Sequence, residues 1–181
     1  SDTVAGILNG IDTTAWDPTT DTDLAQKFSA NTLNLRHLNK LALVEKFGLD
    51  GDDGPLFCVV SRLTDQKGMD LLLQVVDGLV DLGGRLVVLG SGEAYLEDGF
   101  RRQSALHPGK VSIANGYNEA LSHLMQGGSD AILIPSRFEP CGLTQLYALR
   151  AGGGPHWRAG RYGYQCQSGG DGSRGGHGRG L

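Results

Sequence analysis

The stretch LFCVVSRLTDQKGMDLLLQVVDGLVDLGGRLVVLG, residues 56–90, contains two short apolar runs on either side of a helical pattern. The runs at 56–61 and 85–90 are rich in Val and Leu without regular alternation, which is typical of strands buried on both faces of a sheet. Between them, apolar residues recur at the spacing of one helix face, at Leu71, Leu72, Val75, Val76 and Leu79. The stretch therefore predicts a strand, a helix and a second strand parallel to the first.

The same alternation continues along the chain. Two more apolar runs predict strands at 110–114 and 131–135. Helical patterns lie at 31–47, 93–106, 118–128 and 142–150. Strands that alternate with helices predict an α/β fold, here a Rossmann-like, doubly wound parallel sheet. Ligands of such sheets bind beyond the carboxyl ends of the strands, so we expect the functional residues in the loops that follow each strand.

Composition divides the chain near Arg150. Residues 1–150 carry 19 acidic and 12 basic side chains, and this acidic balance argues against a nucleic-acid partner. Residues 151–181 hold 12 of the 29 glycines and four arginines, with no Val, Ile, Phe or Met. Such a segment cannot bury enough apolar surface to offset the entropy of ordering it. We therefore expect a folded part up to about residue 150 and a disordered tail at 151–181, which would leave the helix at 142–150 without a following strand.

Cysteine usage and hydropathy exclude several classes of protein. The three cysteines are odd in number and show no metal-binding spacing, so we expect neither a disulfide framework nor a metal site. No run reaches the roughly 18 apolar residues of a membrane span, and no signal peptide opens the sequence. A cytoplasmic location without a membrane partner is the default expectation. Because the sequence opens without Met, we also expect a fragment of a longer protein.

Two loops carry residues suited to a phosphorylated ligand. Arg62 and Lys67 follow the first strand, where they could bind a diphosphate together or remain two solvated loop cations. After the fourth strand, the run Cys141, Gly142, Leu143 and Thr144 opens a helix, whose free amides and dipole attract an anion. Glu139 precedes this run and either complements the helix dipole or faces a reacting group.

Three further residues have weaker signals. Tyr117 follows the third strand and could stack on a base or pack at the rim of the core. Gly92 belongs to the glycine loop Gly-Ser-Gly at 90–92, which often only lets a strand meet a helix. Asn9 is part of an Asn-Gly pair, which by itself indicates a turn.

Five stretches together resemble the bacterial glycogen synthases and plant starch synthases that use ADP-glucose. They occur in that family's order and are GILNGIDTTAWDPTTD (6–21), VSRLTDQKGMDLLL (60–73), VVLGSGE (87–93), GYNEALSH (116–123) and PSRFEPCGLTQLYALR (135–150). The resemblance implies part of the C-terminal domain of a GT-B glycosyltransferase. It implies glucose transfer from ADP-glucose to the non-reducing end of an α-1,4-glucan, with retention of configuration and without a cofactor or metal. A plant source would imply a plastid location.

The resemblance also implies roles for individual residues. Arg62 and Lys67 would hold the diphosphate and stabilise the leaving ADP, and Glu139 would lie beside the glucose. Tyr117 would stack on adenine with Gly92 packing nearby. Backbone amides from Cys141 to Thr144 would contact phosphate and sugar, and Asn9 would help to line the cleft. The Glu-x7-Glu pattern of many related transferases is absent, because counting from Glu139 reaches Tyr147.

The C-terminal residues depart from the family at a definite point. Back-translation of HWRAGRYGYQCQ (156–167) with permitted codons, read one nucleotide later, gives Thr-Gly-Gly-Leu-Ala-Asp-Thr-Val-Ile-Asn-Ala, which includes the family motif expected there. We therefore expect that residues from about 151 are read out of frame after a small deletion. A native Gly/Arg-rich tail is the alternative reading.

These observations divide the chain into three segments: a cleft-lining interdomain segment at 1–30, a partial nucleotide-sugar-binding domain at 31–150 and the out-of-frame tail at 151–181. We expect a fragment of an ADP-glucose-dependent glycogen or starch synthase that is inactive alone, with ADP-glucose and an α-1,4-glucan as partners of the full enzyme. One alternative is another GT-B transferase, sucrose synthase-like or trehalose-forming. A second is a catalytically silent module that binds nucleotide or glucan.

Overall fold

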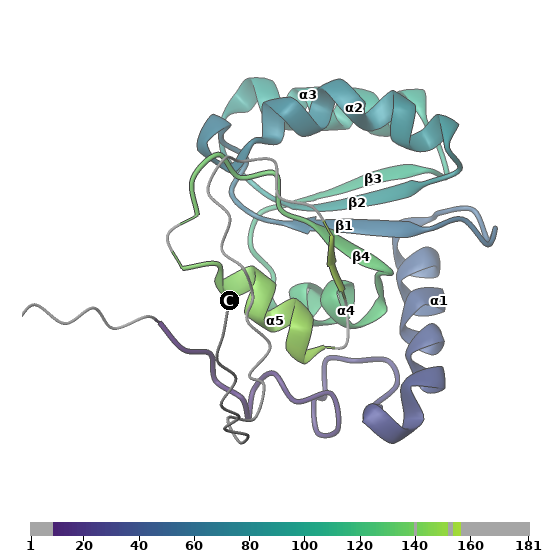
Figure 1. Ribbon diagram of the computed structural model, residues 1–181. Helices are drawn as coiled ribbons and strands as arrows, with labels where there is room; N and C mark the ends of the chain where they lie inside the picture. Colours follow the sequence, from purple (N-terminus) through teal and green to yellow (C-terminus); the bar gives the residue numbers. More distant parts are fainter. Residues whose placement is uncertain (1–8, 140, 152–153, 157–181) are drawn as a thin grey trace, which may run out of the picture.

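The computed structural model describes residues 9–139, 141–151 and 154–156 (Figure 1). Its centre is a parallel sheet of five strands in the order β3-β2-β1-β4-β5. The strands are β1 (Leu56–Val60), β2 (Arg85–Gly90), β3 (Val111–Asn115), β4 (Ala131–Leu133) and β5 (Gly154–His156). The chain moves outward from β1 to β3 and then returns to the other side of β1, so the direction of winding switches between β1 and β4. The predicted doubly wound sheet is confirmed.

Helices cover both faces of this sheet (Figure 1). They are η1 (Ala30–Leu35), α1 (Arg36–Phe47), η2 (Asp65–Lys67), α2 (Met69–Asp81), α3 (Ala94–Leu106), α4 (Glu119–Gly128) and α5 (Leu143–Arg150). Helices α2 and α3 lie on one face, whereas α1, α4 and α5 lie on the other. Within the described residues, no helix is both long enough and apolar enough to cross a membrane.

Strand β2 shows why its sequence lacks alternation. All six of its residues are buried. Leu86 and Val88 pack with α2 and α3, while Val87 and Leu89 pack with α1 and α4 on the opposite face. Because successive side chains of a strand point to opposite faces, a strand with a core on each side needs apolar residues at consecutive positions, here Leu86 to Leu89.

Two predicted elements differ in extent from the observed ones. The helix expected at 31–47 is divided into η1 and α1, with non-helical backbone at Thr32 (φ −128°, ψ 33°). Ser29 N–H donates to Thr32 Oγ1 at 2.9 Å, a local side-chain bond that competes with regular helix. The strand expected at 131–135 ends at Leu133, two residues before Pro135, which has no N–H for the ladder.

The structure corrects the expectation that α5 has no following strand. Gly154–His156 forms β5, parallel to β4, with Pro155 opposite Ile132. An edge position accepts proline because only one side of an edge strand is paired. A strand thus lies inside the segment expected to be disordered. Strand β5 is held by backbone hydrogen bonds to β4, and the apolar content of a segment does not predict such pairing. Residues 157–181 of the expected tail lie outside the described residues.

Candidate active site

The loops after β1 and β4 meet at the point where the winding switches. Gly68, at the start of α2, has a φ of +68°, and a Cβ atom there would lie 2.1 Å from the carbonyl oxygen of Pro135. Only glycine allows this approach. Arg137 N–H donates to Gln66 O at 3.0 Å across the same junction. We call the two joined segments, residues 65–70 and 136–139, the loop clamp.

Charged side chains complete the loop clamp. Lys67 Nζ donates to Glu139 Oε2 at 2.7 Å, and both side chains are only 17% exposed. Ser136 Oγ donates to the same oxygen at 3.0 Å. Nearer the solvent, Arg137 Nη2 donates to Asp70 Oδ2 at 2.7 Å, and this hydrogen bond lowers the pKa of Asp70. Lys67 has three N–H donors, so its bond to Glu139 leaves capacity for a ligand.

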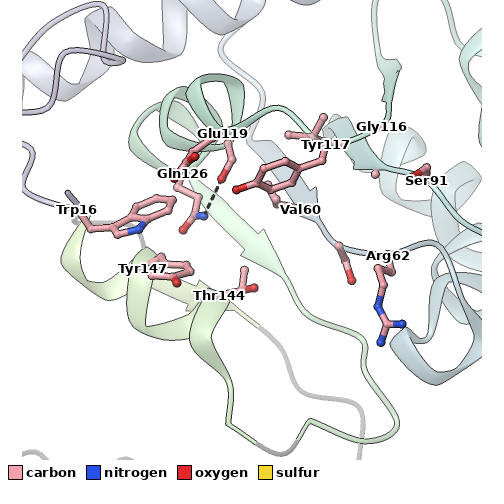
Figure 2. Close-up of a pocket in the computed structure, with 14 residues that line it drawn as sticks. Trp16, Val60, Arg62, Ser91, Gly116, Tyr117, Glu119, Gln126, Thr144 and Tyr147 are labelled. Carbon is pink, nitrogen blue, oxygen red and sulfur yellow. Dashed lines mark hydrogen bonds between the residues drawn. The ribbon is translucent and has the colours of Figure 1, made fainter. Parts of the chain in front are cut away.

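Two adjoining cavities lie at this end of the sheet. The larger one, about 310 Å³, opens between the ends of β1 and β2 and the helices α4 and α5 (Figure 2). Arg62 is exposed and lines this pocket, whereas Lys67 and Glu139 line the smaller cavity. Val60, Ser61 and Thr144 belong to both. The two loop cations therefore border neighbouring cavities and do not meet in one place.

The start of α5 faces both cavities. Gly142, its N-cap, has a φ of +69°, a conformation that favours glycine. Leu143 and Thr144 form the first turn, where amide groups have no partner within a helix. Thr144 lines both cavities, and Cys141 is exposed just before the helix. The predicted anion-binding run thus lies immediately beside Glu139.

Three other predicted site residues have distinct positions. Tyr117 is 81% exposed and lines the large pocket (Figure 2). Gly92 packs against the loop after β1, where an added Cβ would lie 2.2 Å from Leu63 O. Its N–H donates to Glu97 Oε1 at 2.9 Å, a bond that lowers the pKa of Glu97. Gly92 therefore joins two loops and does not line the pocket. Asn9 is exposed and does not line either of these two cavities.

The residues that close the far end of the large pocket are not among those predicted from the sequence. Trp16 stacks between His123 of α4 and Tyr147 of α5, with ring centroids 3.7 Å and 4.1 Å away. It lies in a segment before α1, residues 12–24, that we call the strap. Trp16 and Tyr147 both line the pocket (Figure 2). A single tryptophan in a turn-rich segment gives no periodic pattern. The only signal in the sequence was that Trp16 lies in the stretch 6–21, which resembles the synthase family.

Two polar contacts near Trp16 hold the strap against α4 and α5. Asp21 Oδ2 lies 2.6 Å from His123 Nδ1, and Asp17 Oδ2 lies 3.0 Å from Arg150 Nη2. The side chains of Asp21 and His123 are 8% and 5% exposed. Asp23 brings a third potential metal-ligating atom within 4.8 Å of these two. The contact of His123 with Asp21 accounts for the orientation of the imidazole that stacks on Trp16.

Curated proteins similar to this chain are bacterial glycogen synthases. The glycogen synthase of Mesorhizobium japonicum is 58% identical over 147 residues, which are 81% of this chain and 31% of that protein. The glycogen synthase of Novosphingobium aromaticivorans is 58% identical over 149 residues, covering 82% and 31% of the two chains. The chain thus spans about 31% of the length of the curated relatives it matches.

Solved structures extend the comparison to the fold. The catalytic domain of starch synthase IV from Arabidopsis thaliana, bound to ADP and acarbose, matches with a TM-score of 0.75 and 39% identity over 83% of this chain and 31% of that one. A glycosyltransferase from Rickettsia africae shares the fold at 19% identity and a TM-score of 0.52, over 80% and 35% of the two chains. The sequence pattern described as "Glycosyl transferases group 1" matches residues 44–153. The chain therefore belongs to the group 1 glycosyl transferase family and forms part of a GT-B fold.

Proposed function

We propose that this chain is the donor-binding part of a glycogen or starch synthase that transfers glucose from ADP-glucose to an α-1,4-glucan. The observation that carries the proposal is the pairing of Lys67 with Glu139 beside the start of α5, at the switch between β1 and β4. Ligands of doubly wound sheets bind at this point. The similar starch synthase domain was solved with ADP and acarbose, which supports a nucleotide donor and a glucan-like acceptor.

The geometry suggests how the donor would lie. Its diphosphate would sit between Arg62 and the first turn of α5, because Arg62 and Thr144 border the same pocket. Its glucose would lie in the large pocket beside the smaller cavity, which Glu139 and Lys67 line and which, at about 20 Å³, holds little more than a water molecule. Its base would stack on Tyr117, the exposed aromatic ring in the pocket wall.

The reaction needs positive charge that is in place before the glycosidic bond breaks. As ADP leaves, negative charge grows on the diphosphate, and Lys67 and Arg62 would stabilise that charge together with the amides of α5. The hydrogen bond from Lys67 to Glu139 holds the Lys67 side chain in position. In the proposed complex Glu139 would also lie beside the glucose, where its carboxylate favours the positive charge that develops on the sugar ring. No metal is required for this arrangement, because the cations are side chains.

Donor binding can be tested on the 181-residue chain. We expect calorimetry to detect ADP binding, with UDP bound more weakly, and we expect no glucose transfer by the chain alone. A GT-B site lies between two domains, so the acceptor side would come from other parts of a longer protein. Stronger binding of UDP than of ADP would contradict the assignment of the donor.

Transfer can be tested in a chimera. Residues 9–150 of this chain would replace the matching segment of the Mesorhizobium japonicum glycogen synthase, which serves as the control. We expect the chimera to transfer glucose from radiolabelled ADP-glucose to glycogen and to discriminate against UDP-glucose. A folded chimera that binds ADP without transferring glucose would favour a silent binding module. Transfer to fructose or glucose phosphate instead of glycogen would favour a sucrose synthase-like or trehalose-forming enzyme.

The proposal extends to the C-terminal residues. We infer that residues from about 151 come from a shifted reading frame, because permitted codons exist for 156–167 that, read one nucleotide later, encode the motif expected in this family. Sequencing the coding DNA around codon 150 tests this. A missing or added nucleotide relative to related genes is expected, and an alternative frame that stops at once would contradict it.

A further inference from the structure

Helix α2 carries apolar side chains on two faces, but only one of these faces is buried. On the inner face, Leu72 and Val76 are 4% and 0% exposed and pack against the sheet. On the outer face, apolar or small residues follow the spacing of four and then three residues that is typical of helix–helix contacts, at Leu71, Val75 and Gly78. Val75 is 55% exposed. A helix that is apolar on more than one face is normally covered on each of them.

The outer face of α2 forms one wall of an apolar groove, which we call the α2 groove. Its volume is about 370 Å³, and its other wall is Leu133 of β4 with the next two residues, Ile134 and Pro135. Every residue that lines it is apolar except Gln74. Folded proteins seldom expose a continuous apolar surface of this kind, and such a surface marks a place where another segment or molecule docks.

Gly78 indicates that the occupant of the α2 groove is a helix that comes close. A glycine inside a helix weakens that helix relative to alanine. Gly78 is exposed, and a Cβ atom added to it would have no packing neighbour within 4 Å, so the described part of the chain does not require glycine here. A glycine on a helix surface lets a second backbone approach more closely than a side chain would allow. A second helix that crosses α2 at this point would explain the glycine.

The connections of the sheet leave this face of β4 open. Helices α2 and α3, which lead to β2 and β3, lie on one face of the sheet, whereas α4 and α5, which lead to β4 and β5, lie on the other (Figure 1). Because crossovers between parallel strands are right-handed, the connections between β1 and β5 place no further helix beside α2. A chain that leaves the edge strand β5 can turn back over this face. The chain spans about 31% of its curated relatives, so a longer protein of the family has the residues to supply such a helix.

We propose that the α2 groove holds an amphipathic helix that follows the fifth strand of the sheet in the full-length protein, and that this helix crosses α2 at Gly78. Its apolar side chains would cover Val75 and the end of β4. Asp81 is exposed two helical turns after the groove residue Gln74, so a basic side chain on the docked helix would complement it. The inference involves no nucleotide and is independent of the proposed donor site.

The first test measures whether the α2 groove is covered. Val75→Cys is made in the 181-residue chain and in the Mesorhizobium japonicum chimera, in which the residues after position 150 are those of the host synthase. A maleimide should label the new thiol about tenfold or more slowly in the chimera than in the 181-residue chain, because a docked helix must first open. Leu106→Cys, at a 62% exposed position of α3, is the control and should react alike in both proteins. Equal labelling at position 75 in the two proteins overturns the proposal.

The second test identifies the segment that covers the groove. A photoreactive benzoylphenylalanine replaces Gln74, at the rim of the groove, in the chimera. Mass spectrometry should find it cross-linked to host residues that follow the fifth strand. Cross-links to residues before the replaced segment, or to a second molecule of the chimera, overturn the assignment of the occupant.

The third test uses Gly78→Ala, which should have opposite effects in the two proteins. In the 181-residue chain it should raise the melting temperature by about 1–4 °C, because alanine favours the helix. In the chimera the added methyl group should meet the docked helix and lower the melting temperature. A rise in both proteins overturns the close crossing at Gly78.

Discussion

The loop clamp and the strap both join parts of the chain that are far apart in sequence, but they use different chemistry. The loop clamp joins the loops after β1 and β4 through charged pairs, Lys67 with Glu139 and Arg137 with Asp70. The strap joins a segment before α1 to α4 and α5 through the stacked ring of Trp16, with the Asp21–His123 contact and the Asp17–Arg150 ion pair beside it. In the proposed donor complex, the charged region would lie beside the leaving diphosphate, and the aromatic region would lie beside the nucleoside, which does not change during the reaction.

The charged contacts of the loop clamp and the aromatic contacts of the strap should affect a reaction differently. Charges placed where negative charge develops stabilise a transition state more than a bound substrate. Stacked rings and neutral polar groups contact parts of the ligand that do not change during the reaction, so they contribute equally to both states. Variants in the two regions should therefore differ in whether they change kcat, KM or the stability of the fold.

The largest effect should follow loss of the central cation. In the chimera, Lys67→Ala should lower kcat by roughly 10²–10³, by analogy with the loss of one preorganised group that stabilises developing charge. Steady-state kinetics with ADP-glucose measures this. Lys40→Ala is the matched control, because Lys40 also forms an ion pair, with Asp130 at 2.6 Å, away from both cavities. A variant in which only KM for ADP-glucose rises would contradict the role of Lys67.

Trp16→Ala should mainly destabilise the fold. It removes both stacking contacts and leaves a gap between α4 and α5, and we expect the free energy of unfolding to fall by about 2–3 kcal/mol for this half-buried ring. Urea unfolding of the 181-residue chain measures the change, and Trp16→Phe, which keeps one ring in the gap, should lose less. Equal stability of Trp16→Ala and the unmodified chain would show that the strap does not hold α4 and α5 together.

Tyr117→Ala should affect binding without affecting the chemical step. Base stacking is worth about 1–2 kcal/mol in other nucleotide complexes, so KM for ADP-glucose should rise roughly tenfold while kcat changes little. Kinetics of the chimera measures both constants, with Leu82→Ala as a control at an exposed apolar side chain outside the pocket. A fall in kcat at unchanged KM would mean that Tyr117 does not stack on the base.

The smallest effect should be a pH dependence at the outer pair of the loop clamp. The hydrogen bond from Arg137 lowers the pKa of Asp70 in the folded state, so the pair stabilises the fold above the unfolded pKa of about 3.9. That stabilisation should be lost as the pH falls through the lower folded value. Melting temperatures of the unmodified chain and Asp70→Asn should therefore differ at pH 7 and converge below about pH 4. A difference that stays constant over this range would contradict the linkage.

Periodicity predicted the sheet well because each of β1 and β2 is covered on both faces and shows this in its composition. The same logic missed β5, since Gly154, Pro155 and His156 pair through the backbone at an edge and carry no apolar signature. Strand-end positions also pointed to Arg62, Glu139 and Thr144, which the structure places around the two cavities. Composition could not show that Lys67 pairs with Glu139. The pair forms because the loops after β1 and β4 come together where Gly68 packs against Pro135.

The strap also bears on the order in which the protein folds. Asp21 and His123 are 102 residues apart, and Asp17 and Arg150 are 133 apart. Contacts across such long loops are slow to form, because the entropy of closing the loop is lost before the contact stabilises the chain. During synthesis the β1–α2–β2 unit, which has mostly local contacts, could fold first. Trp16 could stack on Tyr147 only after residue 147 had been made. The large pocket should thus be the last part of the structure to form, and a refolding phase reported by the environment of Trp16 should follow the formation of the sheet.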